Sequence, residues 1–170
     1  MIMINASKDR SGNLAKIEEC NDAEIISDVL RKSFITVADE FGFTVVNAPY
    51  FTAFTNSEKI QQKLDNGFKV FAYRMNEKIV GTVGFYREND RHIIERLAVL
   101  PEYRHRKIGV KLMEFVENKI KEDNGKIIQL SMVDNNSVLK EWYIKLGYKL
   151  IEIKDKKIAF KIAILEKKIT

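Results

Sequence analysis

The chain has 170 residues, of which 45% are hydrophobic and 31% charged, a composition typical of one globular domain and not of a disordered or fibrous protein. Its single cysteine, Cys20, excludes an internal disulfide and fits a reducing compartment, so we expect a cytoplasmic protein. No apolar run approaches the ~18 residues of a membrane span, and the net charge of +5 admits a nucleic acid, a membrane surface or an anionic small ligand as partner.

Apolar periodicity and turn residues predict the elements of the N-terminal part of the chain. The polar, aperiodic residues 1–12 are expected to form a flexible segment, followed by a single domain over 13–170. Asn21, with Glu24 three residues later, forms a capping box that would begin a helix. In order, we expect a strand over 14–20, a helix over 21–34 with an inner stripe of Ile25, Ile26, Val29, Leu30 and Phe34, a short helix and a loop over 36–56, and a helix from the cap Ser57 to the stop at Asn66-Gly67.

The centre of the chain is expected to form an antiparallel meander, because tight-turn signals at Asn76-Glu77 and Asn89-Asp90 separate three β-rich runs. The full order β-α-α-βββ-α-β-α-ββ predicts an α/β fold with a mixed, mostly antiparallel central sheet flanked by helices. The expected segments are strands over 68–75, 78–88 and 91–99, a helix starting near Gly109, a strand over 126–133, a helix over 136–146, and closing strands over 148–154 and 158–165.

A run of basic residues precedes the helix that starts near Gly109. A helix N-terminus presents unpaired backbone N–H groups and the positive end of the helix dipole, so basic side chains and a glycine there favour a phosphate or pyrophosphate ligand. The spacing matches neither the Walker G-x-x-x-x-G-K-[ST] loop nor the Rossmann G-x-G-x-x-G loop. From these residues alone, a phosphate cradle and a basic surface turn both remain open. The basic residues are Arg104, His105, Arg106 and Lys107.

Two blocks of sequence resemble the GNAT superfamily of acyl-CoA-dependent N-acetyltransferases. The first, LAVLPEYRHRKIGVKLMEFVE (97–117), is similar to the family's [Arg/Gln]-x-x-Gly-x-[Gly/Ala] motif, with Lys107 where the family has its middle glycine. The second, NNSVLKEWYIKLGYK (135–149), resembles the family's Asn-x-x-[Ala]-x-x-x-Tyr-x-x-x-Gly-[Phe/Tyr] segment. The resemblance implies a GNAT-like fold and acetyl-CoA as cosubstrate, with no metal.

The resemblance also implies which residues hold the cosubstrate. In the family, the strand before the cradle splays from its neighbour, and its free amides pair with the pantetheine arm. Asn136 would bind the same arm or cap its helix, and the cradle would hold the pyrophosphate. The implied cofactor-binding residues are Leu97, Ala98, Val99, Arg104, His105, Arg106, Lys107, Ile108, Gly109, Val110, Asn136 and Tyr143.

Tyr143 and Glu95 are the candidate catalytic residues. By resemblance, the Tyr143 hydroxyl would protonate the departing thiolate; the alternative is an aromatic that only packs on its helix. Strict alternation would put Glu95, Leu97 and Val99 on one face and His92 on the other. Glu95 would then accept the amine proton through a water or bind a cationic amine; the alternative is an ion pair with a neighbouring Lys or Arg.

The sequence predicts transfer of an acetyl group from acetyl-CoA to a primary amine of a small molecule or peptide. Asp39 and Glu40 would attract a cationic amine, and Phe41, Phe43 and Tyr50 would wall a pocket, although most aromatics of 36–56 are expected to close the core instead. A non-catalytic acyl-CoA sensor is the alternative. We expect no nucleic-acid or membrane partner, since the sequence shows no recognisable nucleic-acid motif, and we leave a homodimer open.

Overall fold

One eight-stranded sheet organises the protein, and the computed structural model describes it within residues 7–8, 12–155 and 159–170. The strands lie in the order β1-β2-β3-β4-β5-β6-β8-β7, and every neighbouring pair is antiparallel except β5 and β6. The predicted α/β fold with a mixed, mostly antiparallel sheet is therefore confirmed. The strands are β1 (Ser7–Lys8), β2 (Leu14–Glu19), β3 (Lys69–Met75), β4 (Lys78–Glu88), β5 (Arg91–Val99), β6 (Ile127–Val133), β7 (Lys149–Lys154) and β8 (Ile162–Lys168).

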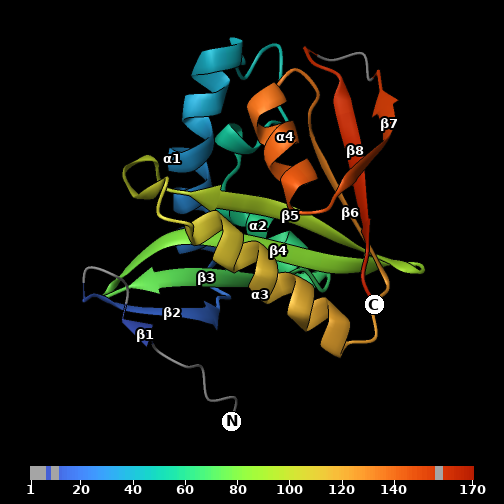
Figure 1. The fold of residues 1–170 in the computed structure, drawn as a ribbon. Helices are drawn as coiled ribbons and strands as arrows, with labels where there is room; N and C mark the ends of the chain where they lie inside the picture. The colour runs from blue at the N-terminus through green and yellow to red at the C-terminus, as the bar shows by residue number, and fades with distance from the viewer. Residues whose placement is uncertain (1–6, 9–11, 156–158) are drawn as a thin grey trace.

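The helices of the described chain cover both faces of this sheet. Figure 1 shows α3 crossing in front of β3, β4 and β5, with α2 behind the sheet. Gly81 of β4 permits the close approach of α3, because a Cβ there would lie 2.9 Å from the Ala98 carbonyl oxygen and 3.1 Å from Leu112. The helices are α1 (Ala23–Phe41), α2 (Ser57–Asp65), α3 (Ile108–Glu122) and α4 (Ser137–Lys145), with 3-10 turns η1 (Thr52–Phe54) and η2 (Pro101–Tyr103).

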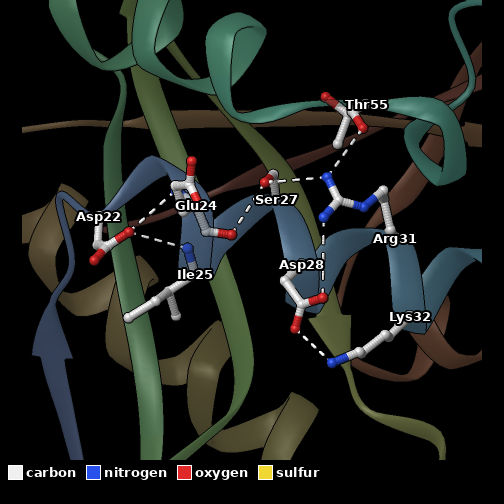
Figure 2. Close-up of polar contacts among 8 residues, drawn as sticks. All are labelled: Asp22, Glu24, Ile25, Ser27, Asp28, Arg31, Lys32 and Thr55. Atoms are coloured by element: carbon white, nitrogen blue, oxygen red, sulfur yellow. Dashed lines mark hydrogen bonds and ion pairs between the residues drawn. The ribbon is translucent and has the colours of Figure 1, made fainter.

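Helix α1 begins one residue later than the capping box predicted. Asp22, not Asn21, is the N-cap, and its Oδ1 accepts hydrogen bonds from the amides of Glu24 and Ile25 at 3.0 Å each (Figure 2). Two adjacent cap-forming residues compete here, and the second one wins. The inner stripe is correct at Ile26, Val29 and Leu30, which are buried, and incorrect at Ile25, which is 42% exposed.

Helix α1 is also longer than predicted, and it takes up the start of the 36–56 segment. It continues to Phe41 because Ala38 is fully buried against a second, small core, and it ends at Gly42 in the left-handed conformation (φ 69°). Aromatic side chains of the following loop fill this small core: the Phe43 and Phe51 rings meet edge to face with centroids 5.0 Å apart. The expectation that most of these aromatics close the core is confirmed.

The boundaries of β4 and β5 are as predicted, and several other elements differ from the prediction by up to a few residues. Asn56 caps α2 in place of Ser57, accepting a hydrogen bond from the Lys59 amide at 2.9 Å. The second closing strand, predicted over 158–165, begins at Ile162 and extends to Lys168. Of the segment predicted to be flexible (1–12), Ser7–Lys8 pairs with Leu14–Ala15, and most of the rest lies outside the described residues.

The only cysteine of the sequence and the lengths of its apolar runs were both used in the sequence analysis. Cys20 is buried, and burial raises the pKa of its thiol, so it packs as a small apolar residue. No helix in the described part of the chain has the length and apolar character needed to cross a membrane.

Candidate active site

The parallel pair β5 and β6 leaves an open edge in the middle of the sheet. Their ladder runs only from His92–Ile128 to Ile94–Leu130, although β5 continues to Val99 and β6 to Val133. Over Glu95 to Val99, the edge of β5 that faces β6 therefore has no strand partner within the described residues. Backbone N–H and C=O groups on such an edge can pair with an extended ligand. The strand splay that the family resemblance implied is present, and Leu97, Ala98 and Val99 lie on it.

A β-bulge at Arg96 reverses the predicted facing of this strand. Val99 lies opposite Gly81 and Glu95 lies opposite Gly84, so two residues of β5, Arg96 and Leu97, oppose the single residue Val83 of β4. Arg96 has φ 60°, the left-handed conformation. Because cross-strand partners point to the same face, Glu95 and Val99 lie on opposite faces. The prediction that they share a face is wrong, since strict alternation does not hold across a bulge.

An unpartnered row of backbone N–H groups lies just beyond this strand, at the N-terminus of α3. No backbone N–H from His105 to Val110 donates a hydrogen bond within the described part of the chain; the neighbouring amides of Arg104 and Lys111 are bound to Pro101 and Lys107 carbonyls. Unpaired N–H groups at the positive end of a helix are donors suited to an anion. These six amides lie where the sequence predicts the phosphate cradle, which stays a prediction.

The loop that carries these amides contains two left-handed residues. His105 and Lys107 both have φ 62°, and Lys107 is the N-cap of α3, without a side-chain capping hydrogen bond. Lys107 thus occupies a glycine-like conformation at the position where the related motif has glycine. The side chains of His105, Arg106 and Lys107 are exposed, whereas Ile108 is buried in the core.

Arg104 ties the cradle to the rest of the fold. Its Nη2 donates to the Ser33 carbonyl at 2.7 Å and to the Thr36 hydroxyl at 3.0 Å, and its Nε donates to the Val99 carbonyl at 3.2 Å. The guanidinium therefore links the loop before α3 to α1 and β5 through hydrogen bonds within the protein. Cofactor binding by Arg104 stays a prediction, since these contacts use only its Nε and Nη2.

Helix α4 brings the candidate acid next to the cradle. A Cβ at Gly109 would lie 3.5 Å from the Trp142 ring, so α3 and α4 are in contact there (Figure 1). Tyr143 is 6% exposed, burial raises its pKa above the usual value, and its hydroxyl makes no hydrogen bond within the described residues. Asn136 caps this helix, accepting from the Leu139 amide at 3.1 Å. The Tyr143 hydroxyl is thus protonated at neutral pH and available as a donor.

Glu95 forms an ion pair on the opposite face of β5 from the cradle. Its Oε2 lies 2.6 Å from Lys63 Nζ of α2 and 4.0 Å from Arg96 Nε. Burial and the charge of Glu95 together raise the pKa of the neighbouring Tyr86 phenol. The ion pair that the sequence left open is therefore present. His92, for which the sequence left a structural or an exposed position open, is 2% exposed, and its Nε2 lies 3.7 Å from the Asp123 carboxylate at the end of α3.

A cavity of about 350 Å³ lies beside this ion pair, and sequence reasoning did not find its polar residues. It opens between the loop before η1, helix α2 and the bulge of β5. Two of the residues predicted for the substrate are here, since Glu95 is paired with the lining residue Lys63 and Tyr50 lines the cavity itself. The others are elsewhere: Asp39 and Glu40 are exposed near the end of α1, and Phe41 stacks on Phe43. No sequence signal marked the bulge that directs Arg96 here. The lining is Pro49, Tyr50, Phe51, Phe54, Thr55, Lys59, Gln62, Lys63, Asn66 and Arg96.

The structure is an α/β protein with a row of unpaired amides at the N-terminus of α3, an open strand edge beside it, and a cavity on the far side of that strand, all within the described residues. No group of three or more His, Cys, Asp or Glu side chains able to hold a metal ion occurs among the described residues. The model of the acetyltransferase (GNAT) domain matches residues 37–161, well over half of the chain. This chain belongs to the GNAT acetyltransferase family.

Individual proteins agree with this assignment. An uncharacterized N-acetyltransferase of Schizosaccharomyces pombe is 38% identical over 82 residues, which span 46% of this chain and 56% of the yeast protein. The PaiA N-acetyltransferase of Thermoplasma acidophilum, solved with coenzyme A, has a TM-score of 0.70 at 23% identity, covering 91% of this chain and 99% of that one. The ribosomal-protein-S18-alanine N-acetyltransferase of Escherichia coli has a TM-score of 0.74 at 13% identity, covering 92% and 94%.

Proposed function

We propose that this protein transfers the acetyl group of acetyl-CoA to a primary amine of a small molecule or peptide. The observation that carries the proposal is the row of six unpartnered amides, His105 to Val110, next to the open edge of β5. A pyrophosphate needs such donors, and an amide-bearing pantetheine arm needs a free strand edge. The solved PaiA protein of the same fold binds coenzyme A, which supports the same ligand here.

Acetyl transfer requires two proton transfers, one from the amine and one to the sulfur of CoA. Acetyl-CoA, when bound, supplies an activated thioester; the amine nitrogen bonds to the acetyl carbon, the C–S bond breaks, the amine loses a proton and the sulfur gains one. We assign protonation of the sulfur to the Tyr143 hydroxyl, because the residue is buried and protonated and its hydroxyl makes no hydrogen bond within the described residues. Glu95, on the cavity side of β5, is the group that would take the amine proton through a water.

The residues that bind the cosubstrate act mostly through their backbone. Residues 105–110 would hold the pyrophosphate with their N–H groups, and Leu97 to Val99 would hold the pantetheine arm along the open edge. Arg106 and Lys107 add positive charge, since both side chains are exposed at the cradle. Asn136 uses its Oδ1 to cap α4, which leaves its amide NH₂ free to bind the arm.

Thiol release separates an enzyme from a binding protein. Acetyl-CoA binding is measured by calorimetry, and CoA release is then followed with a panel of amines, with the N-acetyl product identified by mass. We expect binding and amine-dependent release of CoA, with release but not binding lost in Tyr143→Phe. Tight binding of acetyl-CoA without release by any amine would contradict transfer and leave a sensor of acyl-CoA.

A further inference from the structure

The cavity beside the β5 bulge carries positive charge only. Of its lining residues, Lys59, Lys63 and Arg96 are cationic and none is acidic. Lys63 is neutralised by Glu95, which lies 2.6 Å from it. Lys59 and Arg96 therefore leave a net positive charge in a space of about 350 Å³, which is within the range of small-molecule sites.

Arg96 is the best-defined binding group in this cavity. Its side chain is only 18% exposed, and its one hydrogen bond within the described residues goes from Nη1 to the Thr52 hydroxyl at 2.5 Å. Glu95 Oε2 lies 4.0 Å from its Nε, too far for a hydrogen bond. A guanidinium has five N–H donors in a planar fork, so most of them have no acceptor in the described part of the chain. Burial lowers the pKa of Arg96, which reflects the cost of holding this cation with so few partners.

The position of Arg96 relates it directly to the reaction. It is the left-handed residue of the bulge, adjacent to the open edge along which the pantetheine arm is proposed to lie. A non-glycine residue in this conformation is destabilising, so the bulge is a specific feature of this strand. The bulge places the guanidinium on the cavity side, so a group held by Arg96 lies close to the point where an amine would attack.

The opposite wall of the cavity is held in place by hydrogen bonds. Thr52 of η1 orients the guanidinium, and the Thr55 carbonyl three residues later accepts a hydrogen bond from Arg31 Nη1 at 3.4 Å (Figure 2). Arg31 is itself held by Ser27 at 3.3 Å and lies 3.9 Å from Asp28 on the same helix. This side of the site is therefore preorganised before any acceptor binds.

We propose that the acceptor is an amine that also carries a carboxylate, which Arg96 binds with help from Lys59. The proposal rests on the acetyl-transfer function proposed above and names its substrate class. The guanidinium fork matches a carboxylate in geometry and charge. A polyamine would instead bring a second cation against Lys59 and Arg96, so the cavity disfavours it. The acidic residues Asp39 and Glu40, which favoured a cationic acceptor in the sequence, do not line this space.

Pairs of acceptors that differ only in their carboxylate test directly whether the cavity recognises that charge. Amino acids are compared with their carboxamides, which keep the amine and lose the carboxylate, and spermidine serves as the polyamine. kcat/KM is corrected for the fraction of neutral amine, and affinity for the CoA-loaded protein is measured by calorimetry in parallel. A charge-assisted hydrogen bond predicts a preference of about 10- to 100-fold for the acids. Equal or better use of the carboxamides or of spermidine would overturn the proposal.

Variants then assign the preference to Arg96. Arg96→Asn removes the charge with a residue that tolerates the left-handed conformation, and should abolish the preference. Arg96→Lys should retain part of it, and Thr52→Val, which removes only the orienting hydroxyl, should reduce it while leaving Arg96 in place. Lys121→Gln, which removes an exposed charge at the far end of α3, is the control and should behave as wild type. An unchanged preference in both Arg96→Asn and Thr52→Val would overturn the assignment.

The two readouts separate this inference from the proposed function. If no amine releases CoA while the CoA-loaded protein still binds the acids more tightly than the carboxamides, transfer is contradicted and the carboxylate site stands. If amines are acetylated and the carboxamides are preferred, transfer stands and the carboxylate site is contradicted.

Discussion

Replacing Lys107 by glycine should stabilise the protein while weakening the binding of acetyl-CoA only slightly. Lys107 has φ 62° and ψ 15°, and its exposed side chain makes no hydrogen bond or ion pair with the described residues. The left-handed conformation costs an L-residue roughly 1–2 kcal/mol. Glycine removes that cost but adds about 0.4–1 kcal/mol of chain entropy to the unfolded state.

The balance is a gain of about 0.5–1 kcal/mol in the free energy of unfolding, or a rise of about 1–4 °C in Tm for a chain of this size. Loss of one exposed charge near a phosphate costs about 0.5–1 kcal/mol, so the Kd for acetyl-CoA should rise about 2- to 5-fold. Both quantities are measured on the same samples, by thermal unfolding and by calorimetry.

Lys107→Ala is the matched control, because it removes the same charge but keeps a Cβ in the strained conformation. It should lose affinity like the glycine variant without gaining stability. If the glycine and alanine variants were equally stable, the backbone would not be strained. If both lost acetyl-CoA binding by more than about 100-fold, the lysine would be an essential ligand and the cradle would not act mainly through its amides.

Substitutions at three further positions test pyrophosphate binding by the cradle and the two proton transfers. Gly109→Glu should abolish acetyl-CoA binding in a folded protein. Gly109→Ala should retain binding, because the added Cβ meets Trp142 at an ordinary 3.5 Å. If calorimetry found wild-type affinity for acetyl-CoA in the glutamate variant, the amides of 105–110 would not be the pyrophosphate site. Tyr143→Phe should lower kcat by about 10²–10⁴-fold, less so with a donor whose thiol is a better leaving group, and leave cofactor affinity unchanged; an unchanged kcat would make Tyr143 a packing residue. Glu95→Gln should lower kcat by about 10²-fold or more without changing cofactor affinity; if only the melting temperature fell, Glu95 would be no more than the partner of Lys63.

The parts of the fold set by local sequence could be predicted. The turns at Asn76 and Asn89 are correct, and both residues adopt the left-handed conformation that asparagine tolerates (φ 51° and 55°). Helix α1 was predicted too short because its last two turns are stabilised by tertiary contacts: Ala38 packs into the small core that Phe43 and Phe51 complete. Intrinsic helix preference carries no information about such contacts.

The candidate site could be predicted only where a motif marked it. The glycine and the basic run at a helix start left a phosphate cradle and a surface turn both open, and the resemblance to the GNAT motif favoured a cradle at 105–110. The structure adds amides that are unpaired within the described residues. The cavity could not be found in this way, because it depends on one inserted residue in β5. The bulge at Arg96 breaks the period of two, moves Val99 to the face opposite Glu95 and directs an arginine toward Thr52.

A crystal structure of the protein with coenzyme A tests most directly whether α3 and β5 bind acetyl-CoA through their backbone groups. We expect pyrophosphate oxygens to lie within about 3 Å of several backbone nitrogens from His105 to Val110, and the pantetheine arm to pair with the backbone of Leu97 to Val99. A pyrophosphate held by lysine side chains away from this loop, with the edge of β5 left unpaired, would contradict it.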